Sequence, residues 1–167
     1  MIISRATIED AEQILALQHL SYQSEAEIYN DYTLAPLNQT LEELVDEFDD
    51  YVFLKAVIND RIIGSVRGRM QDGACYVGRL IVHPDYQNQG IGSKLMTEIE
   101  ACFPEAHVYQ VFTGHKSKRN IIIYQKLGYK ISGTEPVTKD YSLKHMTKSV
   151  ETRASAPESG EAGMPSR

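Results

Sequence analysis

One stretch in the middle of the 167-residue chain constrains the fold most, because it predicts a strand, a glycine turn and a helix in immediate succession. Residues 80–82 form a short apolar run rich in β-branched side chains, which is typical of a buried strand. Pro84 cannot donate a hydrogen bond to a neighbouring strand, so the strand ends there. Apolar residues at 91, 95 and 99 then recur at helical spacing, which predicts a helix beginning near Gly90.

The turn carries two glycines, Gly90 and Gly92, at the start of this helix. Without a Cβ atom, the backbone can adopt a positive φ and a ligand can approach it closely. The first N–H groups of a helix have no partner within the helix, and its dipole is positive at that end. The turn is therefore suited to binding phosphate, although the same glycines would also serve a tight packing turn.

In this context the stretch resembles the main motif of the GNAT family of N-acetyltransferases, Gln/Arg-x-x-Gly-x-Gly/Ala. Gln87, Gly90 and Gly92 meet that motif in full. The resemblance implies that acetyl-CoA is the acyl donor, with its pantetheine arm along the strand and its pyrophosphate on the amides of the loop. The residues that it implies in cofactor binding are Leu80, Ile81, Val82, Gln87, Asn88, Gln89, Gly90, Ile91, Gly92 and Ser93. A P-loop fits worse, because no Gly-Lys-Ser/Thr follows.

A second stretch, residues 117–129, resembles the other signature of that family, Asn-x-x-Ala-x-x-Phe/Leu-Tyr-x-Lys-x-Gly-Phe/Tyr. The chain matches it at Tyr124, Lys126, Gly128 and Tyr129. It departs at Ser117, where the family usually has Asn, and at Asn120, where it often has Ala. The resemblance adds Ser117 and Tyr124 to the expected cofactor contacts, but Ser117 could instead only cap its helix.

Tyr124 is the expected catalytic residue. Acetyl transfer from a thioester expels a thiolate, and a positioned acid helps it to leave. A phenol with a pKa of roughly 10 stays protonated at neutral pH and can donate to the sulfur of a thiol whose pKa is roughly 8.5. The alternative is a helix tyrosine that only packs on the sheet. The base that accepts the proton of the amine is left open among Glu25, Glu27, Asp31 and water.

The acceptor is expected to be the amine of a small molecule or a protein, and the sequence points two ways on its charge. Acidic residues gather in the two segments that border the acceptor site in the family: Glu25, Glu27 and Asp31, then Glu42, Glu43, Asp46 and Glu47. They favour a cationic amine. Three arginines on the expected strands, Arg67, Arg69 and Arg79, instead favour an acceptor that carries a carboxylate.

Composition narrows the function classes. A net charge of −6 argues against binding nucleic acid or an anionic membrane. Two cysteines are too few for a disulfide scaffold, and we find no metal-ligand spacing and no metal requirement. The N-terminus does not resemble a signal peptide, and no run reaches the length of a membrane span, so the expected compartment is the cytoplasm. Many proteins of this kind dimerise, so a homodimer is among the expectations.

Hydrophobic periodicity predicts a mixed, mostly antiparallel sheet with helices on both faces, and its element order agrees with the GNAT fold. Helices are expected over 8–20, in a short second piece within 21–31, over 41–48, from 90 to about 102, and from 117. Strands are expected over 2–5, 52–58, 61–70, 74–83, 107–112, 129–131 and 142–146. The strand, crossover helix and strand around 80–112 imply one parallel pair.

The sequence predicts one acetyltransferase domain over residues 1–148 and a disordered tail over 149–167, because the tail has almost nothing to bury. The leading hypothesis is an acetyl-CoA-dependent N-acetyltransferase that works by direct transfer in a ternary complex. The alternatives are a non-catalytic acyl-CoA sensor, which would keep the phosphate loop and lose the acid, and an interaction protein that uses the fold as a scaffold.

Overall fold

The sheet is built around a hairpin that its turn residues dictate. Strand β2 (Val52–Ile58) turns into β3 (Arg61–Gln71) through Asn59 and Asp60. Both turn residues have positive φ, 51° and 63°, as a two-residue hairpin loop of this kind requires. Strand β4 (Ala74–Val82) then pairs antiparallel with β3. The predicted three-stranded meander is confirmed.

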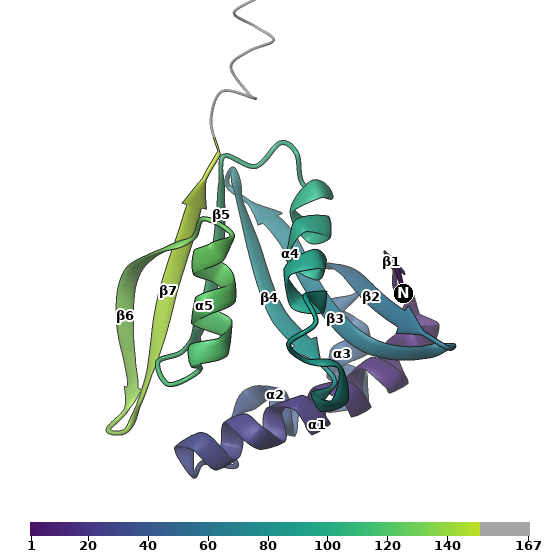
Figure 1. Ribbon diagram of the computed structural model, residues 1–167, viewed down its shortest axis with the longest axis horizontal. Helices are drawn as coiled ribbons and strands as arrows, with labels where there is room; N and C mark the ends of the chain where they lie inside the picture. The colour runs from purple at the N-terminus through teal and green to yellow at the C-terminus, as the bar shows by residue number, and fades with distance from the viewer. Residues whose placement is uncertain (151–167) are drawn as a thin grey trace, which may run out of the picture.

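The computed structural model describes residues 1–150, and its seven strands lie in the order β1-β2-β3-β4-β5-β7-β6 (Figure 1). The remaining strands are β1 (Ile2–Arg5), β5 (Val108–Gly114), β6 (Lys130–Thr138) and β7 (Tyr141–Ser149). Only β4 and β5 are parallel within this sheet, and helix α4 (Ile91–Ala101) makes the crossover between them. The predicted mixed sheet with one parallel pair is confirmed.

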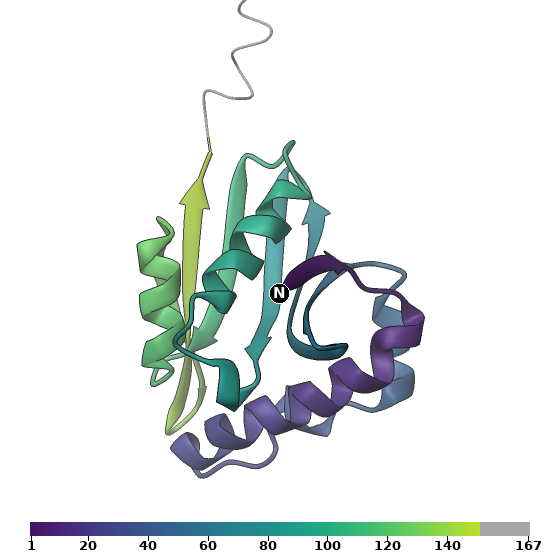
Figure 2. The ribbon, with the colours of Figure 1, turned by 45° about the vertical axis from the view of Figure 1, so that its right-hand side comes forward.

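Helices cover both faces of the sheet, because alternate residues of the central strands point to opposite sides. Phe53 and Ile62 join the apolar cluster of α1 (Ala11–Tyr29) and α3 (Leu41–Glu47), and the next residues, Leu54 and Ile63, join the cluster of α4. In Figure 2, α4 lies against the sheet and α1 crosses near the strand ends. The other helical pieces are α2 (Ala35–Asn38), α5 (Lys118–Lys126) and two 3-10 turns, Ile8–Asp10 and Pro84–Tyr86. No helix among residues 1–150 is long and apolar enough to cross a membrane.

The first helix corrects the prediction of two helices over 8–20 and within 21–31. A short 3-10 turn comes first, and then one continuous helix, α1, runs to Tyr29. Asn30 ends it in the left-handed conformation with a φ of 51°. The prediction stopped at residue 20 because the apolar period stops there, yet the helix continues with polar side chains. The helix expected over 41–48 is α3, and it begins with a capping box in which Thr40 and Glu43 form reciprocal hydrogen bonds of 3.0 and 3.2 Å.

The last hairpin is longer than predicted. The short strands expected over 129–131 and 142–146 are β6 and β7, each of nine residues. Strand β6 lies at the sheet edge and is exposed along its whole length, so it shows no apolar alternation to read. The predicted start of the disordered tail at residue 149 is too early. Ser149 is the last residue of β7, and the Val150 amide donates to the His107 carbonyl at 2.9 Å. The rest of that prediction, 151–167, lies outside the described residues.

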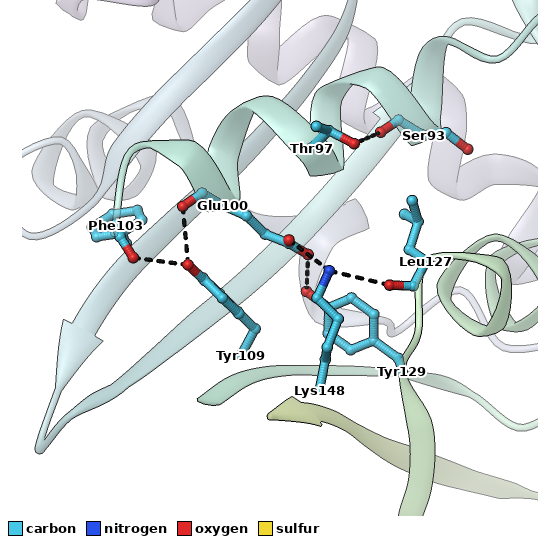
Figure 3. Close-up of polar contacts among 8 residues, drawn as sticks. All are labelled: Ser93, Thr97, Glu100, Phe103, Tyr109, Leu127, Tyr129 and Lys148. Atoms are coloured by element: carbon cyan, nitrogen blue, oxygen red, sulfur yellow. Dashed lines mark hydrogen bonds and ion pairs between the residues drawn. The ribbon is translucent and has the colours of Figure 1, made fainter. Parts of the chain in front are cut away.

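A polar cluster fastens α4 to the last strand and to the chain after α5 (Figure 3). The Lys148 Nζ atom lies 2.7 Å from Glu100 Oε1 and donates to the Leu127 carbonyl at 3.1 Å. The Tyr129 hydroxyl donates to the other carboxylate oxygen of Glu100 at 2.7 Å. The Tyr109 hydroxyl donates to the Phe103 carbonyl at 2.8 Å. We call Glu100, Tyr129 and Lys148 the brace.

Candidate active site

The site is created by a split between two parallel strands. Residues 74–76 of β4 pair with 108–110 of β5, and within the described chain the two strands do not pair with each other beyond these residues. The cause lies in a β-bulge, where the register between β3 and β4 shifts by one residue between Ser65 and Arg67. Arg79 sits in the bulge with a φ of 52°. A bulge bends and twists its strand, and the carboxyl end of β4 diverges from β5 (Figure 1). Residues at this divergence line two cavities.

The first cavity, of about 510 Å³, lies along residues 80–82 of β4, where the edge of this strand that faces β5 has no strand partner. Its walls come from α1, β4, the glycine loop and α5. They are Ser21, Tyr22, Ser24, Glu25, Leu80, Ile81, Val82, Tyr86, Gln87, Asn88, Gly90, Ile91, Gly92, Ser93, Arg119, Asn120, Ile122, Ile123 and Lys126. Because β4 has an unpaired edge here, an extended ligand arm can add to it in the manner of a further strand.

Glycine is favoured at the two positions of the loop for different structural reasons. Gly90 precedes α4 with a φ of 83°, and a Cβ built on it would meet open space. Gly92 lies inside the helix, where a Cβ would sit 3.4 Å from Ile123 Cδ1, so it permits close packing of α4 and α5. The Gln87 side chain donates to the Val82 carbonyl at 3.1 Å and ties the loop to the end of its strand. The loop therefore presents the start of α4 to the cavity in a fixed geometry.

The chemistry of the first cavity fits a phosphorylated ligand with an extended arm. The N-terminal amides of α4 and the cations of Arg119 and Lys126 face the same space. The Ser21 hydroxyl lies on the same wall, and it is buried without a hydrogen-bond partner among residues 1–150. A buried hydroxyl without a partner is a cost to the fold unless a ligand or water engages it.

The second cavity, of about 410 Å³, lies on the other side of the same split. It shares four wall residues with the first cavity: Tyr22, Glu25, Leu80 and Asn120. Its polar and aromatic walls include Asp31, Thr33, Tyr51, Arg67, Tyr76, Arg79, Thr113, Tyr124, Thr138 and Tyr141. The two cavities therefore meet around shared side chains, so that a group held in one can reach a group held in the other.

Tyr124 lines the second cavity with only 4% of its surface exposed. Its hydroxyl has no hydrogen-bond partner within the described part of the chain, although its ring contacts Tyr129 at 5.8 Å between centroids. Burial raises the pKa of Tyr124 above its usual value, and Tyr22 and Glu25 nearby raise it further. The phenol is therefore protonated across the neutral range and has a free donor.

Ser117 takes a position that the sequence did not predict. Its side chain does not cap α5, and it lines neither cavity. It is buried, and its hydroxyl donates to the carboxylate of Glu25. The Tyr29 hydroxyl lies 3.4 Å from the same Ser117 oxygen. Ser117 thus orients Glu25, a residue that faces both cavities.

The structure brings most of the predicted site residues together. Those that line the first cavity are Leu80, Ile81, Val82, Gln87, Asn88, Gly90, Ile91, Gly92 and Ser93. Tyr124 lines the second cavity, and Gln89 and Ser117 line neither. Of the three candidate bases, Glu25 faces both cavities and Asp31 faces the second, whereas Glu27 is exposed elsewhere.

Sequence reasoning missed Tyr22 and the roles of α5 in the first cavity. Tyr22 and Glu25 are three residues apart on one helix, and this spacing is the signal that could have found them. Asn120 was noticed only as a departure from the family motif, yet it lines both cavities. Arg119 follows Lys118 in the first turn of α5, and this pair of cations near the glycine loop was a readable signal.

Residues 49–131 match the family model described as the acetyltransferase (GNAT) domain. The PaiA N-acetyltransferase of Thermoplasma acidophilum, solved with coenzyme A, is 21% identical over 90% of this chain and 100% of its own, with a TM-score of 0.68. YncA of Salmonella typhimurium, solved with acetyl-CoA, is 22% identical over 91% and 95% of the two chains, with a TM-score of 0.71.

A third structure of the same fold is the ribosomal-protein-alanine N-acetyltransferase of Brucella melitensis. It is 21% identical over 90% of this chain and 100% of its own, with a TM-score of 0.70. A search of curated protein sequences finds no match. At these identities the solved structures establish a common fold, and the domain match adds the family.

Proposed function

Because the chain belongs to the GNAT acetyltransferase family, we propose that it transfers the acetyl group of acetyl-CoA to a primary amine by direct transfer in a ternary complex. The observation that carries the proposal is the meeting of two cavities at the split between β4 and β5. One cavity suits the donor, the other suits an acceptor, and the tyrosine expected to assist the leaving group stands in the second. No covalent enzyme intermediate is needed when both substrates can meet.

The first cavity is the proposed donor site. The pantetheine arm would lie along the unpaired edge of β4 at residues 80–82 and satisfy backbone groups that have no strand partner there. The pyrophosphate would lie at the start of α4, beside Gly90, where the helix dipole and free amides favour negative charge. Arg119 and Lys126 would add positive charge around the phosphates.

In the chemical step, the lone pair of the neutral amine attacks the thioester carbonyl carbon and forms the C–N bond. Collapse of the tetrahedral intermediate breaks the C–S bond and releases the CoA thiolate. Tyr124 then donates a hydrogen bond and finally its proton to the sulfur. Burial raises the pKa of this phenol, so it still carries its proton when the thiolate forms, and the phenolate regains a proton from solvent after the products leave.

The amine must lose one proton to become a neutral amide. Glu25 is the proposed acceptor, directly or through a water molecule, because its carboxylate faces both cavities and is held by Ser117. Asp31 is less suited, because its carboxylate already accepts hydrogen bonds from the hydroxyl and the amide of Thr33, and these lower its pKa. A weaker base serves proton transfer less well.

The direct test is release of free CoA thiol from acetyl-CoA in the presence of a panel of amines and protein N-termini. Calorimetry on the same preparation should show tighter binding of CoA than of dephosphorylated pantetheine. If CoA binds and no amine is acetylated, the protein is an acyl-CoA sensor and not an enzyme. If CoA and pantetheine bind equally well, the assignment of the glycine loop to phosphate is wrong.

A further inference from the structure

Two carboxylates, Glu25 and Asp31, and two arginines, Arg67 and Arg79, face the second cavity, and the two arginines are partnered differently. Arg67 on β3 forms an ion pair with Glu47 at the end of α3. Arg79 on β4 donates from NH1 to the neutral amide oxygen of Gln39 at 3.1 Å, and it has no ion pair among residues 1–150. Both arginines line the cavity. Arg79 is therefore the arginine of this wall whose guanidinium has no direct ion-pair partner in the described chain.

Arg67 also keeps an unused donor. Its Nε atom is buried and has no hydrogen-bond partner in the described chain, while its guanidinium lies 4.1 Å from the centroid of the Tyr51 ring. Burial and then the neighbouring Arg79 lower the pKa of Arg67, and Glu47 opposes them. A carboxylate between the two arginines would satisfy free donors and neutralise their mutual repulsion, because the flat guanidinium fork matches carboxylate geometry.

The backbone at Arg79 supports a functional reason for that side chain. Its φ of 52° is a left-handed conformation that is costly for a residue with a Cβ and far easier for glycine or asparagine. The position nevertheless carries a long cationic side chain on a cavity wall. Strained positions that persist in a fold cluster at ligand sites.

Negative charge lines the same cavity. Glu25 faces it from α1, beside the entrance to the donor cavity. Tyr22 lines both cavities, and both kinds of charge act on it: burial raises its pKa, Arg79 lowers it and Glu25 raises it. A molecule with a positive group near Glu25 and a negative group near Arg79 matches both kinds of charge.

Most of the acidic residues that favoured a cationic acceptor do not line the second cavity. Glu42, Glu43 and Asp46 of α3 are exposed and line neither cavity. Glu47 is already paired with Arg67. Asp31 faces the cavity but accepts hydrogen bonds from Thr33. The space of about 410 Å³ suits a small molecule.

We propose that the acceptor is a small zwitterionic amine, a free amino acid or a close relative, whose carboxylate is bound by Arg79 and Arg67 while its amine faces Glu25 and the thioester. The proposal rests on the N-acetyltransferase function proposed above. The carboxylate of a free amino acid is absent beside the amine of a peptide N-terminus, so the arginines also discriminate against proteins as acceptors.

The first experiment measures acetylation of the twenty common amino acids with acetyl-CoA. The best acceptor is then compared with its carboxamide, which keeps the shape and loses the charge, and with its decarboxylated amine. We expect kcat/KM to favour the amino acid over both analogues by about tenfold to a hundredfold, the effect of a hydrogen-bonded charge. Equal or better activity with either analogue would overturn the proposal and leave the acetyltransferase function intact.

The second experiment uses variants of matched arginines. Arg79→Gln should raise KM for the amino acid by about tenfold and leave the carboxamide unaffected, and Arg79→Lys should restore part of the loss. Arg69→Gln is the control, because Arg69 lies over the same Tyr51 ring at 5.3 Å and lines neither cavity. If both glutamine variants act alike, or if Arg79→Gln affects every amine equally, Arg79 does not bind a carboxylate.

A binding measurement separates the two proposals. Calorimetric titration of the same amino acids into the CoA-saturated protein reports the carboxylate site without turnover. If no amine is acetylated, the proposed transfer fails, yet amino-acid binding that Arg79→Gln weakens would still support the site. Absence of binding, or binding that the variant leaves unchanged, would overturn the site whatever the activity.

Discussion

The two ends of the junction between β4 and β5 differ in how they treat buried polar groups. At the paired end, beside residues 74–76 and 108–110, the brace satisfies its carboxylate, ammonium and hydroxyl groups within the protein (Figure 3). At the split end, Ser21 Oγ and Arg67 Nε are buried and lack partners among the described residues, and the third such atom, Arg69 Nε, belongs to the residue that pairs with Tyr76 beside the paired end. Buried polar groups are normally paired. The brace therefore has a structural role, and the two unpartnered atoms at the split end agree with the ligand sites proposed above.

The contrast has one origin, the bulge at Arg79. Before the bulge the strands are close enough to pair, so backbone and side-chain groups find partners along the sheet. After it they diverge, and the hydrogen-bonding capacity of the β4 edge and of the arginines is left for other molecules. If this interpretation is right, substitutions at the split end should change activity with little effect on stability, and substitutions at the brace should do the reverse.

The largest effect is expected for Tyr124→Phe at the split end. The change removes a hydroxyl that has no partner among residues 1–150 and leaves the ring packed, so folding and CoA affinity should be kept. If the hydroxyl protonates the leaving thiolate, kcat should fall by roughly 10²–10⁴. Steady-state kinetics with saturating acetyl-CoA would measure it, and a loss below about threefold would transfer the role to water.

The matched control is Tyr129→Phe at the brace. Its hydroxyl donates to Glu100 at 2.7 Å and faces neither cavity. Loss of a hydrogen bond to a charged group costs about 1.5–3 kcal/mol, which lowers the Tm of a chain this size by several degrees. kcat should stay near that of the unchanged protein, and a large fall would mean that the two ends are not independent.

The pH dependence of kcat/KM tests the assignment of Tyr124 as the acid. The amine reacts only when neutral, so kcat/KM should rise about tenfold per pH unit below the pKa of the amine. Tyr124 acts in its protonated form, and its raised pKa moves the loss of that proton above the usual value of about 10. We therefore expect no fall in rate up to about pH 10. A fall at or below that pH that disappears in Tyr124→Phe would show that the pKa of the phenol is not raised.

A smaller effect is expected for Gly90→Val at the glycine loop. The φ of 83° strains any residue with a Cβ by about 1–2 kcal/mol, and the added methyls point into open space beside the proposed pyrophosphate site. CoA affinity measured by calorimetry should fall by about tenfold or more, since close approach to the amides is lost. Gly73→Val is the control, because Gly73 has a φ of 82° and lies outside both cavities. Equal CoA affinity in the two variants would contradict the assignment.

Lys148→Met tests the brace directly. It removes the ammonium that contacts Glu100 and the Leu127 carbonyl and leaves the partly buried Glu100 carboxylate with fewer partners. We expect a loss of about 1–3 kcal/mol, seen as a Tm lower by several degrees, with CoA affinity unchanged. Lys144→Met on the same strand should change Tm little, because the Lys144 ammonium only contacts an exposed threonine, Thr134. Similar losses in both variants would show that the brace adds nothing specific.

The strand order, the glycine loop and most residues of the first cavity were predictable from sequence, whereas the brace and the bulge that opens the split were not. The β2–β3 hairpin, the capping box and the parallel crossover follow from turn chemistry and apolar periodicity, which report on local backbone geometry and on the core. The prediction ended the first helix at residue 20, where the apolar period stops and α1 begins to line the cavities with Ser21 and Tyr22. Residues that face a ligand do not follow the pattern of the core.

Two other features of the site, the bulge and the contact between Ser117 and Glu25, could not be predicted from sequence patterns. The bulge depends on a left-handed arginine, a conformation that sequence rules assign to glycine or asparagine. The contact between Ser117 and Glu25 joins residues 92 positions apart, and only the packing of α1 against the start of α5 brings them together. The family motif pointed to position 117, but it could not show that a serine there would reach a carboxylate.

The smallest effect concerns the backbone conformation of the bulge. Two substitutions of Arg79 separate the effect of this conformation on Tm from the effect of the arginine charge on acceptor preference. Arg79→Asn removes the guanidinium but places a residue that tolerates positive φ, so Tm should stay within about 2 °C of the unchanged protein. Arg79→Val removes the same charge and places a β-branched residue where φ is 52°, so Tm should fall by several degrees. Both variants should lose the preference for amino acids over their carboxamides. If Arg79→Asn lowers Tm as much as Arg79→Val, the arginine side chain itself stabilises the bulge, and the division between a stable paired end and a functional split end does not hold at this position.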